Sequence, residues 1–141
     1  MRANYSAGFD YFARANDDVL CIVMVETAEA VAHVDDIVSV PGVDAVYVGP
    51  ADLSVTLGLP PAADQDAASF NDALARILAA CEKHGVEPGI AGNQNTAPKR
   101  VEQGFRLVEA AADAALLASA VGQALRAVDP GRGSESKTSY L

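Results

Sequence analysis

Two patterns of apolar and polar positions alternate along the chain. Short, nearly continuous apolar runs are typical of strands buried on both faces, and longer stretches with one apolar face are typical of amphipathic helices. The apolar runs predict strands at residues 19–25, 45–48, 86–91 and 105–109. The helical stretches predict helices at residues 8–16, 28–39 and 111–128, one more ending at His84-Gly85 and another between Thr96 and Gly104.

The order of these elements predicts the fold class. Strands and helices alternate with short connections and make four βα units. Such alternation is typical of an α/β fold with a parallel sheet and right-handed crossovers. From the pattern alone, a doubly wound open sheet and part of a (β/α)8 barrel both fit.

The composition is that of one globular domain with a substantial core. The chain has 141 residues, half of them apolar, and its apolar runs are too short to span a bilayer. The first residues lack the apolar segment of a signal peptide, so we expect a cytoplasmic protein. A formal net charge of −9 disfavours nucleic acids and anionic membranes as partners.

The remaining compositional features receive ordinary structural interpretations. No metal-binding spacing connects Cys21 with Cys81, and both are expected to be buried free thiols. The polar residues 129–141 are expected to form a disordered tail after a domain at residues 1–128.

Chemistry is expected just beyond the strands, because reactive groups gather at the carboxyl ends of parallel strands. Glu26 and Asp52 follow two neighbouring strands, so both carboxylates could reach one point above the sheet. Two such carboxylates coexist at low cost when a cation lies between them, and they suit Mg²⁺ or Mn²⁺. In the alternative interpretation, Glu26 is a solvated strand end and Asp52 is a helix N-cap.

Other polar residues near the strand ends have several interpretations. The turn at Gly49-Pro50 would direct the N–H groups of Ala51 and Asp52 into the same cavity, where a carboxylate could bind. Glu109 follows the fourth strand and is a candidate for an internal ion pair, as is Arg106. The remaining candidates are read as surface or structural residues: Asp35-Asp36 as a solvated helix face, His33 and His84 as surface histidines, and Asp113 as a cap or ion-pair residue.

One long segment carries a family resemblance. Residues 23–60, with the sequence VMVETAEAVAHVDDIVSVPGVDAVYVGPADLSVTLGLP, resemble the signature region of the HpcH/HpaI aldolase/citrate lyase family. PGIAGN at residues 88–93 and GFRLVEAAAD at residues 104–113 resemble the last two strands of that family. Arg2, Tyr5, Tyr11 and Ala15-Asn16 resemble its preceding segment, so the resemblance covers residues 2–128.

The resemblance implies a fold, an activity and a set of site residues. Members of the family are (β/α)8 barrels that cleave or form a C–C bond next to a 2-oxo acid, commonly pyruvate, with an aldehyde as the other partner. A divalent metal chelates the oxo acid and stabilises its enolate. By resemblance, Glu26 and Asp52 are the metal ligands, and the backbone N–H groups of Ala51 and Asp52 hold the substrate carboxylate.

Two departures from the family pattern bear on activity. Met24 stands where the family commonly has Gln. The first four βα units, which in the family carry the catalytic histidine and the arginine that binds the oxo acid, have no counterpart in this sequence, so no catalytic residue is identified. The alternatives are a metal-dependent aldolase that assembles as a homo-oligomer, an inactive half-barrel that only binds metal and oxo acid or pairs with an N-terminal half, and the product of a truncated gene.

Overall fold

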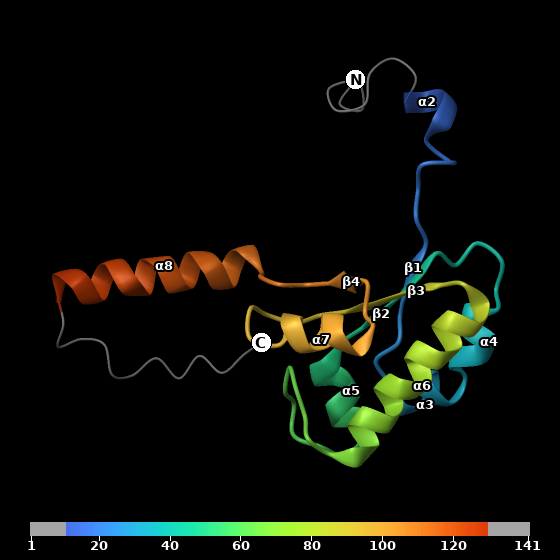
Figure 1. Ribbon diagram of the computed structural model, residues 1–141. Coiled ribbons are helices and arrows are strands. Elements are labelled where there is room, and N and C mark those ends of the chain that lie inside the picture. The colour runs from blue at the N-terminus through green and yellow to red at the C-terminus, as the bar shows by residue number, and fades with distance from the viewer. Residues whose placement is uncertain (1–10, 130–141) are drawn as a thin grey trace.

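The computed structural model describes residues 11–129 and is built on one four-stranded parallel sheet (Figure 1). The strands lie in the order β1-β2-β3-β4, so neighbours in the sequence are also neighbours in the sheet. Their bounds are Ile22–Met24 for β1, Ala45–Val48 for β2, Glu87–Ile90 for β3 and Leu107–Val108 for β4. The predicted α/β class, the predicted order of strands and the predicted bounds of β2 are therefore confirmed, although β1, β3 and β4 are shorter than predicted.

The helices also follow the predicted order, with two differences, one of which is a short helix at Pro50–Thr56 that follows the turn at Gly49-Pro50. The predicted helix at residues 28–39 is two helices, because His33 has φ −106° and ψ 16° and interrupts it. The helices are α2 (Tyr11–Arg14), α3 (Ala28–Ala32), α4 (Val34–Val38), α5 (Pro50–Thr56), α6 (Ala68–His84), α7 (Ala97–Gln103) and α8 (Asp113–Val128). Residues 8–10 of the predicted first helix and residues 130–141 of the predicted tail lie outside the described residues.

The core lies between one face of the sheet and the helices α3 to α7, which gather on that face (Figure 1). The strands β2 and β3 contribute three side chains with no exposed surface, those of Val46, Val48 and Ile90, and Val25 directly after β1 contributes a fourth. The long helix α6 packs against them with Phe70, Leu74, Ile77 and other apolar residues at helical spacing. This packing fixes which side chain of each strand points toward the helices and which points away.

The opposite face of the sheet is largely uncovered. Side chains alternate between the two faces of a strand, so Ile22 and Met24 of β1 point away from the core, and their exposed fractions are 44% and 56%. Leu107 of β4 is 42% exposed. The prediction that the first strand is buried on both faces is therefore wrong, because the helices of the described residues cover only one face.

The two cysteines lie in different environments. Cys81 of α6 is buried, as predicted, and burial raises the pKa of its thiol to about 11. Cys21 is exposed, which corrects the prediction that it is buried. It directly precedes β1, and its N–H group donates a hydrogen bond to Asp44 Oδ2 at 2.7 Å.

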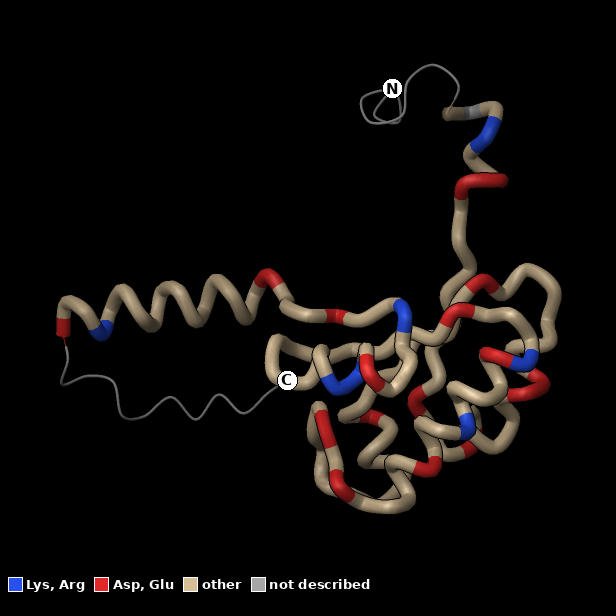
Figure 2. The backbone as a smooth tube through the Cα atoms, viewed as in Figure 1, with Lys and Arg blue, Asp and Glu red and all other residues tan. Residues whose placement is uncertain are grey.

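Helix α8 extends away from the sheet (Figure 1), and none of its residues is buried. Between Asp113 and Arg126 it carries no charged residue (Figure 2). Its large apolar side chains are exposed, among them Leu116, Leu117, Val121 and Leu125. None of the helices within residues 11–129 is long and apolar enough to cross a membrane.

The core position of Phe70 generates a stability prediction. Its ring is fully buried, so Phe70→Ala should lower the free energy of unfolding by about 3–5 kcal/mol through lost burial and an unfilled cavity. Urea denaturation followed by circular dichroism measures this change. The matched control is Val101→Ala on an exposed helical surface, which should change stability by less than about 0.5 kcal/mol. Equal effects of the two substitutions would contradict the described core.

Candidate active site

The carboxyl ends of the four strands surround a cavity of about 380 Å³. Its walls come from the segments that follow β1, β2, β3 and β4 and from the first turns of α8. The lining residues with polar side chains are Glu26, Asp52, Asn93, Gln94, Asn95, Glu109 and Ser119, and Gly49 and Ala91 directly follow β2 and β3. The cavity thus lies where the sequence analysis places the chemistry of this fold.

The Glu26 and Asp52 side chains converge beside Gly49. A methyl group built on Gly49 would lie 2.5 Å from Glu26 Oε2 and 3.6 Å from Asp52 Oδ2. Both carboxylate oxygens therefore face the same point, and that point is free only because residue 49 has no side chain. This arrangement favours the predicted pairing of the two carboxylates over the alternative of two unrelated surface groups.

Backbone hydrogen bonds hold the two carboxylate-bearing segments together. The N–H group of Val25, next to Glu26, donates to the Tyr47 carbonyl oxygen at 3.0 Å. The Thr56 hydroxyl, at the end of α5, accepts a hydrogen bond from the Ala28 N–H group at 3.1 Å and lies 3.4 Å from the Glu26 carbonyl oxygen. Helix α5, which carries Asp52, is thereby tied to the loop that carries Glu26.

Helix α5 begins at the cavity with uncapped N–H groups. Gly49 is its N-cap and offers no side chain, and Pro50 has no N–H group. The N–H groups of Ala51 and Asp52 belong to the first turn, where an α-helix provides no acceptor. Both residues line the cavity, so the structure brings together the carboxylate pair and the predicted backbone donors.

Glu109 also faces the cavity, but not as an ion pair. Its Oε2 accepts a hydrogen bond from the Tyr47 hydroxyl at 3.3 Å. Burial raises the pKa of Tyr47, and the negative charge of Glu109 raises it further. Sequence reasoning missed Tyr47, although its place two residues before Gly49 on the same strand puts both residues on one face of the sheet.

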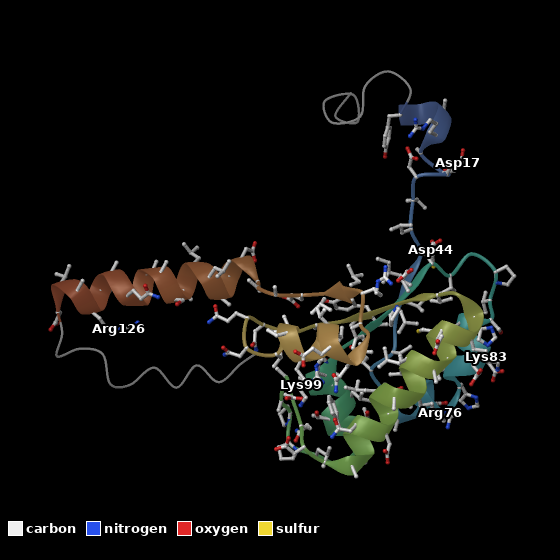
Figure 3. All side chains as sticks on the ribbon, viewed as in Figure 1. Asp17, Asp44, Arg76, Lys83, Lys99 and Arg126 are labelled. Atoms are coloured by element: carbon white, nitrogen blue, oxygen red, sulfur yellow. The ribbon has the colours of Figure 1, made fainter. Side chains whose placement is uncertain are left out.

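The other candidate residues lie elsewhere. Neither His33 nor His84 lines the cavity, and His84 Nε2 lies 3.3 Å from Asp35 Oδ1. Lys83 Nζ donates to the same Asp35 oxygen at 2.6 Å, so Asp35 is part of a charged cluster rather than a simple solvated face (Figure 3). Asp113 is the first residue of α8, whose N-cap is Ala112, and its Oδ1 accepts a hydrogen bond from the adjacent Ala114 N–H group, so the prediction that Asp113 caps the helix is wrong.

A buried charged group shapes one wall of the cavity. Arg100 of α7 is fully buried and pairs with Asp64 in the loop between α5 and α6, at 2.7 Å. It also donates to the Ala63 carbonyl oxygen at 3.2 Å, and Ala63 lines the cavity. Lys99, labelled in Figure 3, binds the second oxygen of Asp64 at 2.7 Å. These contacts, which sequence reasoning also missed, fix the loop against α7.

The donor set fits a hard divalent cation. The described lining of the cavity includes the carboxylates of Glu26, Asp52 and Glu109 but no Lys, Arg or His side chain. Within residues 11–129, no three or more His, Cys, Asp and Glu side chains gather closely enough to hold a metal ion. A cation beside Gly49 would thus have two protein carboxylates and open positions for water or a ligand, which suits Mg²⁺ or Mn²⁺.

Four consecutive βα units whose parallel strands lie side by side in chain order, without the reversal of a doubly wound sheet, make this chain part of a TIM-barrel-type scaffold. Comparison with known sequences gives the family. The family model described as HpcH/HpaI aldolase/citrate lyase matches residues 3–120, and the chain belongs to this family.

Individual relatives agree with this assignment. The hydroxypyruvate/pyruvate aldolase of Rhizorhabdus wittichii is 36% identical over 125 residues, which cover 88% of this chain and 50% of that protein. The 4-hydroxy-2-oxo-heptane-1,7-dioate aldolase of Escherichia coli is 34% identical over 130 residues, which cover 86% of this chain and 49% of that protein. The chain therefore spans about half the length of the curated relatives it matches.

A solved structure of another family member resembles this chain in its fold. The crystal structure of a family member from Burkholderia cenocepacia matches with a TM-score of 0.73 and 42% sequence identity. The match covers 84% of this chain and 46% of that structure. The expected partial barrel is thereby confirmed at the level of the fold.

The Asp64–Arg100 pair generates a prediction about pH. Burial raises the pKa of Asp64, but the hydrogen bond from Lys99 and the charge of Arg100 outweigh it, so the pKa of Asp64 lies below its ordinary value. Because the pKa of Asp64 is lower in the folded state, its ionised carboxylate stabilises the fold at pH values above the ordinary pKa of an aspartate, which is near 4. This stabilisation is lost as the pH falls through the pKa of Asp64 in the folded state. Asp64→Asn should therefore lower the free energy of unfolding by about 3 kcal/mol at pH 7, since it leaves the buried Arg100 charge unpaired.

Urea titrations at pH 7, 5 and 3 test this prediction. The difference between the wild type and Asp64→Asn should narrow as the pH falls from 5 to 3. Asp66→Asn, which alters an exposed carboxylate in the same loop, is the matched control and should have little effect at any pH. If the free energies of unfolding of the wild type and Asp64→Asn differ by the same amount at all three pH values, the charge pair does not stabilise the fold.

Proposed function

We propose that this chain forms the metal-binding half of an aldolase. The enzyme would cleave or form a C–C bond next to a 2-oxo acid such as pyruvate, with an aldehyde as the other partner. The observation that carries the proposal is the convergence of Glu26 Oε2 and Asp52 Oδ2 beside Gly49. Membership of the family and the aldolase names of its relatives support it.

In this proposal, each group beside Gly49 has a defined task. Glu26 and Asp52 hold a divalent cation, Mg²⁺ or Mn²⁺, which supplies Lewis-acid stabilisation of the negative charge that develops on the oxo acid. The N–H groups of Ala51 and Asp52 bind the carboxylate of the oxo acid and orient it. Met24 lines the cavity beside them and contributes an apolar wall where the family commonly has a polar side chain.

Proton transfer requires residues beyond those described. His33 and His84 are remote from the cavity, and the family resemblance places the catalytic histidine and arginine in the four βα units that precede this region. We therefore propose that the active unit includes four further βα units against the uncovered face of the sheet. A half-barrel that binds metal and oxo acid without turnover is the second candidate, and the exposure of Ile22, Met24 and Leu107 on that face favours it for this chain in isolation.

We further propose the extent of the domain, its compartment and its assembly state. Residues 1–128 act as one unit, residues 129–141 are a polar extension, and the cytoplasm is the proposed compartment. Homo-oligomers are the proposed assembly state, because an uncovered apolar face and open sheet edges promote association.

Metal binding can be measured without any assumption about turnover. Titration of the purified chain with Mn²⁺, followed by electron paramagnetic resonance, should show one site whose affinity falls at least tenfold in Asp52→Asn and in Glu26→Gln. Pyruvate should bind to the Mn²⁺-loaded chain and not to the metal-free chain. Glu29→Gln removes an exposed carboxylate near the same strand and should leave the Mn²⁺ affinity unchanged.

The outcomes separate the candidate functions. Release of pyruvate from a 4-hydroxy-2-oxo acid, lost in Asp52→Asn, would show that the chain assembles a working site by itself. Metal and pyruvate binding without turnover would identify the isolated half-barrel. Absence of Mn²⁺ binding in the wild type would refute the proposed function.

The uncovered face generates a separate prediction about assembly. Sedimentation velocity over a range of concentrations should show association of the chain, because exposed apolar side chains on a sheet bury themselves against a partner. Leu107→Lys, which places a charge on that face, should shift the distribution toward the monomer. Val101→Lys, on the exposed surface of α7, is the control and should not. A strictly monomeric wild type would exclude the proposed homo-oligomer.

A further inference from the structure

Glu109 belongs to the same layer of side chains as Glu26. The paired residues Met24, Tyr47, Gly89 and Leu107 lie side by side across the sheet and point to its uncovered face. The residues two positions further toward the carboxyl end of each strand all line the cavity. They are Glu26, Gly49, Ala91 and Glu109. Glu109 thus faces the cavity from the opposite edge of the sheet to Glu26.

Tyr47 holds the Glu109 carboxylate in place by reaching across β3. A methyl group built on Gly89 would lie only 2.9 Å from Tyr47 Cδ2 and 3.2 Å from Leu107 Cβ. The Tyr47 ring therefore occupies the space above Gly89, and its hydroxyl donates to Glu109 Oε2 at 3.3 Å. The carboxylate is a positioned group of the cavity wall and not a mobile surface charge.

Glu109 does not join the carboxylate pair beside Gly49. No group of three such ligands exists within residues 11–129, and β1 and β4 are separated by two other strands, about 14 Å at ordinary strand spacing. The chelating end of a 2-oxo acid held at Glu26 and Asp52 would therefore lie away from Glu109, and only the far end of the molecule could reach that carboxylate.

The charge of Glu109 itself distinguishes between two kinds of far end. The described lining offers no Lys, Arg or His side chain that could neutralise a second carboxylate. A ligand carboxylate beside Glu109 would meet a like charge in a partly buried cavity, whereas a ligand hydroxyl would donate a hydrogen bond to the free lone pairs of the carboxylate.

We propose that Glu109, positioned by Tyr47, is a specificity-determining residue that favours substrates whose far end carries hydroxyl groups over substrates whose far end carries a carboxylate. The inference rests on the proposed function, since it requires the oxo acid to be anchored beside Gly49. It assigns the aldehyde partner to a chemical class, the neutral hydroxyaldehydes.

Two 4-hydroxy-2-oxo acids provide the test. One is 4,5-dihydroxy-2-oxopentanoate, which ends in a hydroxyl group, and the other is 4-hydroxy-2-oxo-heptane-1,7-dioate, which ends in a carboxylate. Each is titrated into the full chain loaded with Mn²⁺, in competition with pyruvate, and the water-proton relaxation rate reports occupancy. The wild type should bind the dihydroxy acid at least tenfold more tightly than the dicarboxylic acid.

Three variants isolate the contribution of Glu109. Glu109→Gln keeps the size of the side chain and removes its charge, so the preference should fall at least fivefold while the pyruvate affinity stays unchanged. Tyr47→Phe keeps the ring above Gly89 and removes only the hydroxyl, so the preference should fall by a smaller factor of about two to three. Glu102→Gln removes an exposed carboxylate of α7 and should leave the preference unchanged.

The two proposals fail in different ways. If pyruvate does not bind to the Mn²⁺-loaded wild type, the proposed function fails and this inference fails with it. If pyruvate binds but neither Glu109→Gln nor Tyr47→Phe alters the preference between the two acids, only the inference about Glu109 is overturned. An unchanged pyruvate affinity in a variant shows that the variant is folded at the site.

Discussion

The packing of one face of the sheet against helix α6 is the interaction on which the rest of the structure depends. Val25, Val46, Val48 and Ile90 are buried against the apolar side of that helix. Because side chains alternate along a strand, this burial, together with the packing of Val108 of β4 against the core, directs Glu26, Tyr47, Gly49 and Glu109 to the other face. The hydrophobic effect thus orients groups that make no hydrophobic contact themselves, and the chemistry of the cavity follows from the composition of the core.

Missing side chains shape the cavity as much as the polar ones do. Gly49 leaves the point at which two carboxylates converge, and Gly89 leaves the channel through which Tyr47 reaches Glu109. The Asp64–Arg100 pair then holds the loop that forms a further wall. The glycines therefore create the space of the cavity, and the buried Asp64–Arg100 pair limits that space by fixing one wall.

The sequence predicts local features well and pairings across the sheet poorly. The element order, the helix ends at Gly85 and Gly104 and the nearness of Glu26 to Asp52 all follow from short segments read with the rules for parallel strands. The exposure of β1 does not, because an apolar run looks the same whether helices cover one face or both. Tyr47 and Glu109 are 62 positions apart, and their contact depends on the register of the strands. Asp64 and Arg100 are 36 positions apart, and their contact depends on the path of a loop. No local sequence pattern encodes either contact.

The crossing of Tyr47 over Gly89 has a consequence for how this cavity can evolve. Any side chain larger than hydrogen at position 89 would collide with the ring and with the backbone oxygen of Val46, 2.7 Å from the place of its Cβ. A smaller residue at position 47 would remove the clash with the ring but not the clash with the Val46 oxygen, so position 89 is restricted to glycine whatever residue stands at position 47. The far wall of the cavity can therefore vary through Tyr47 and Glu109, whereas Gly89 is a fixed position of the backbone around which such changes occur.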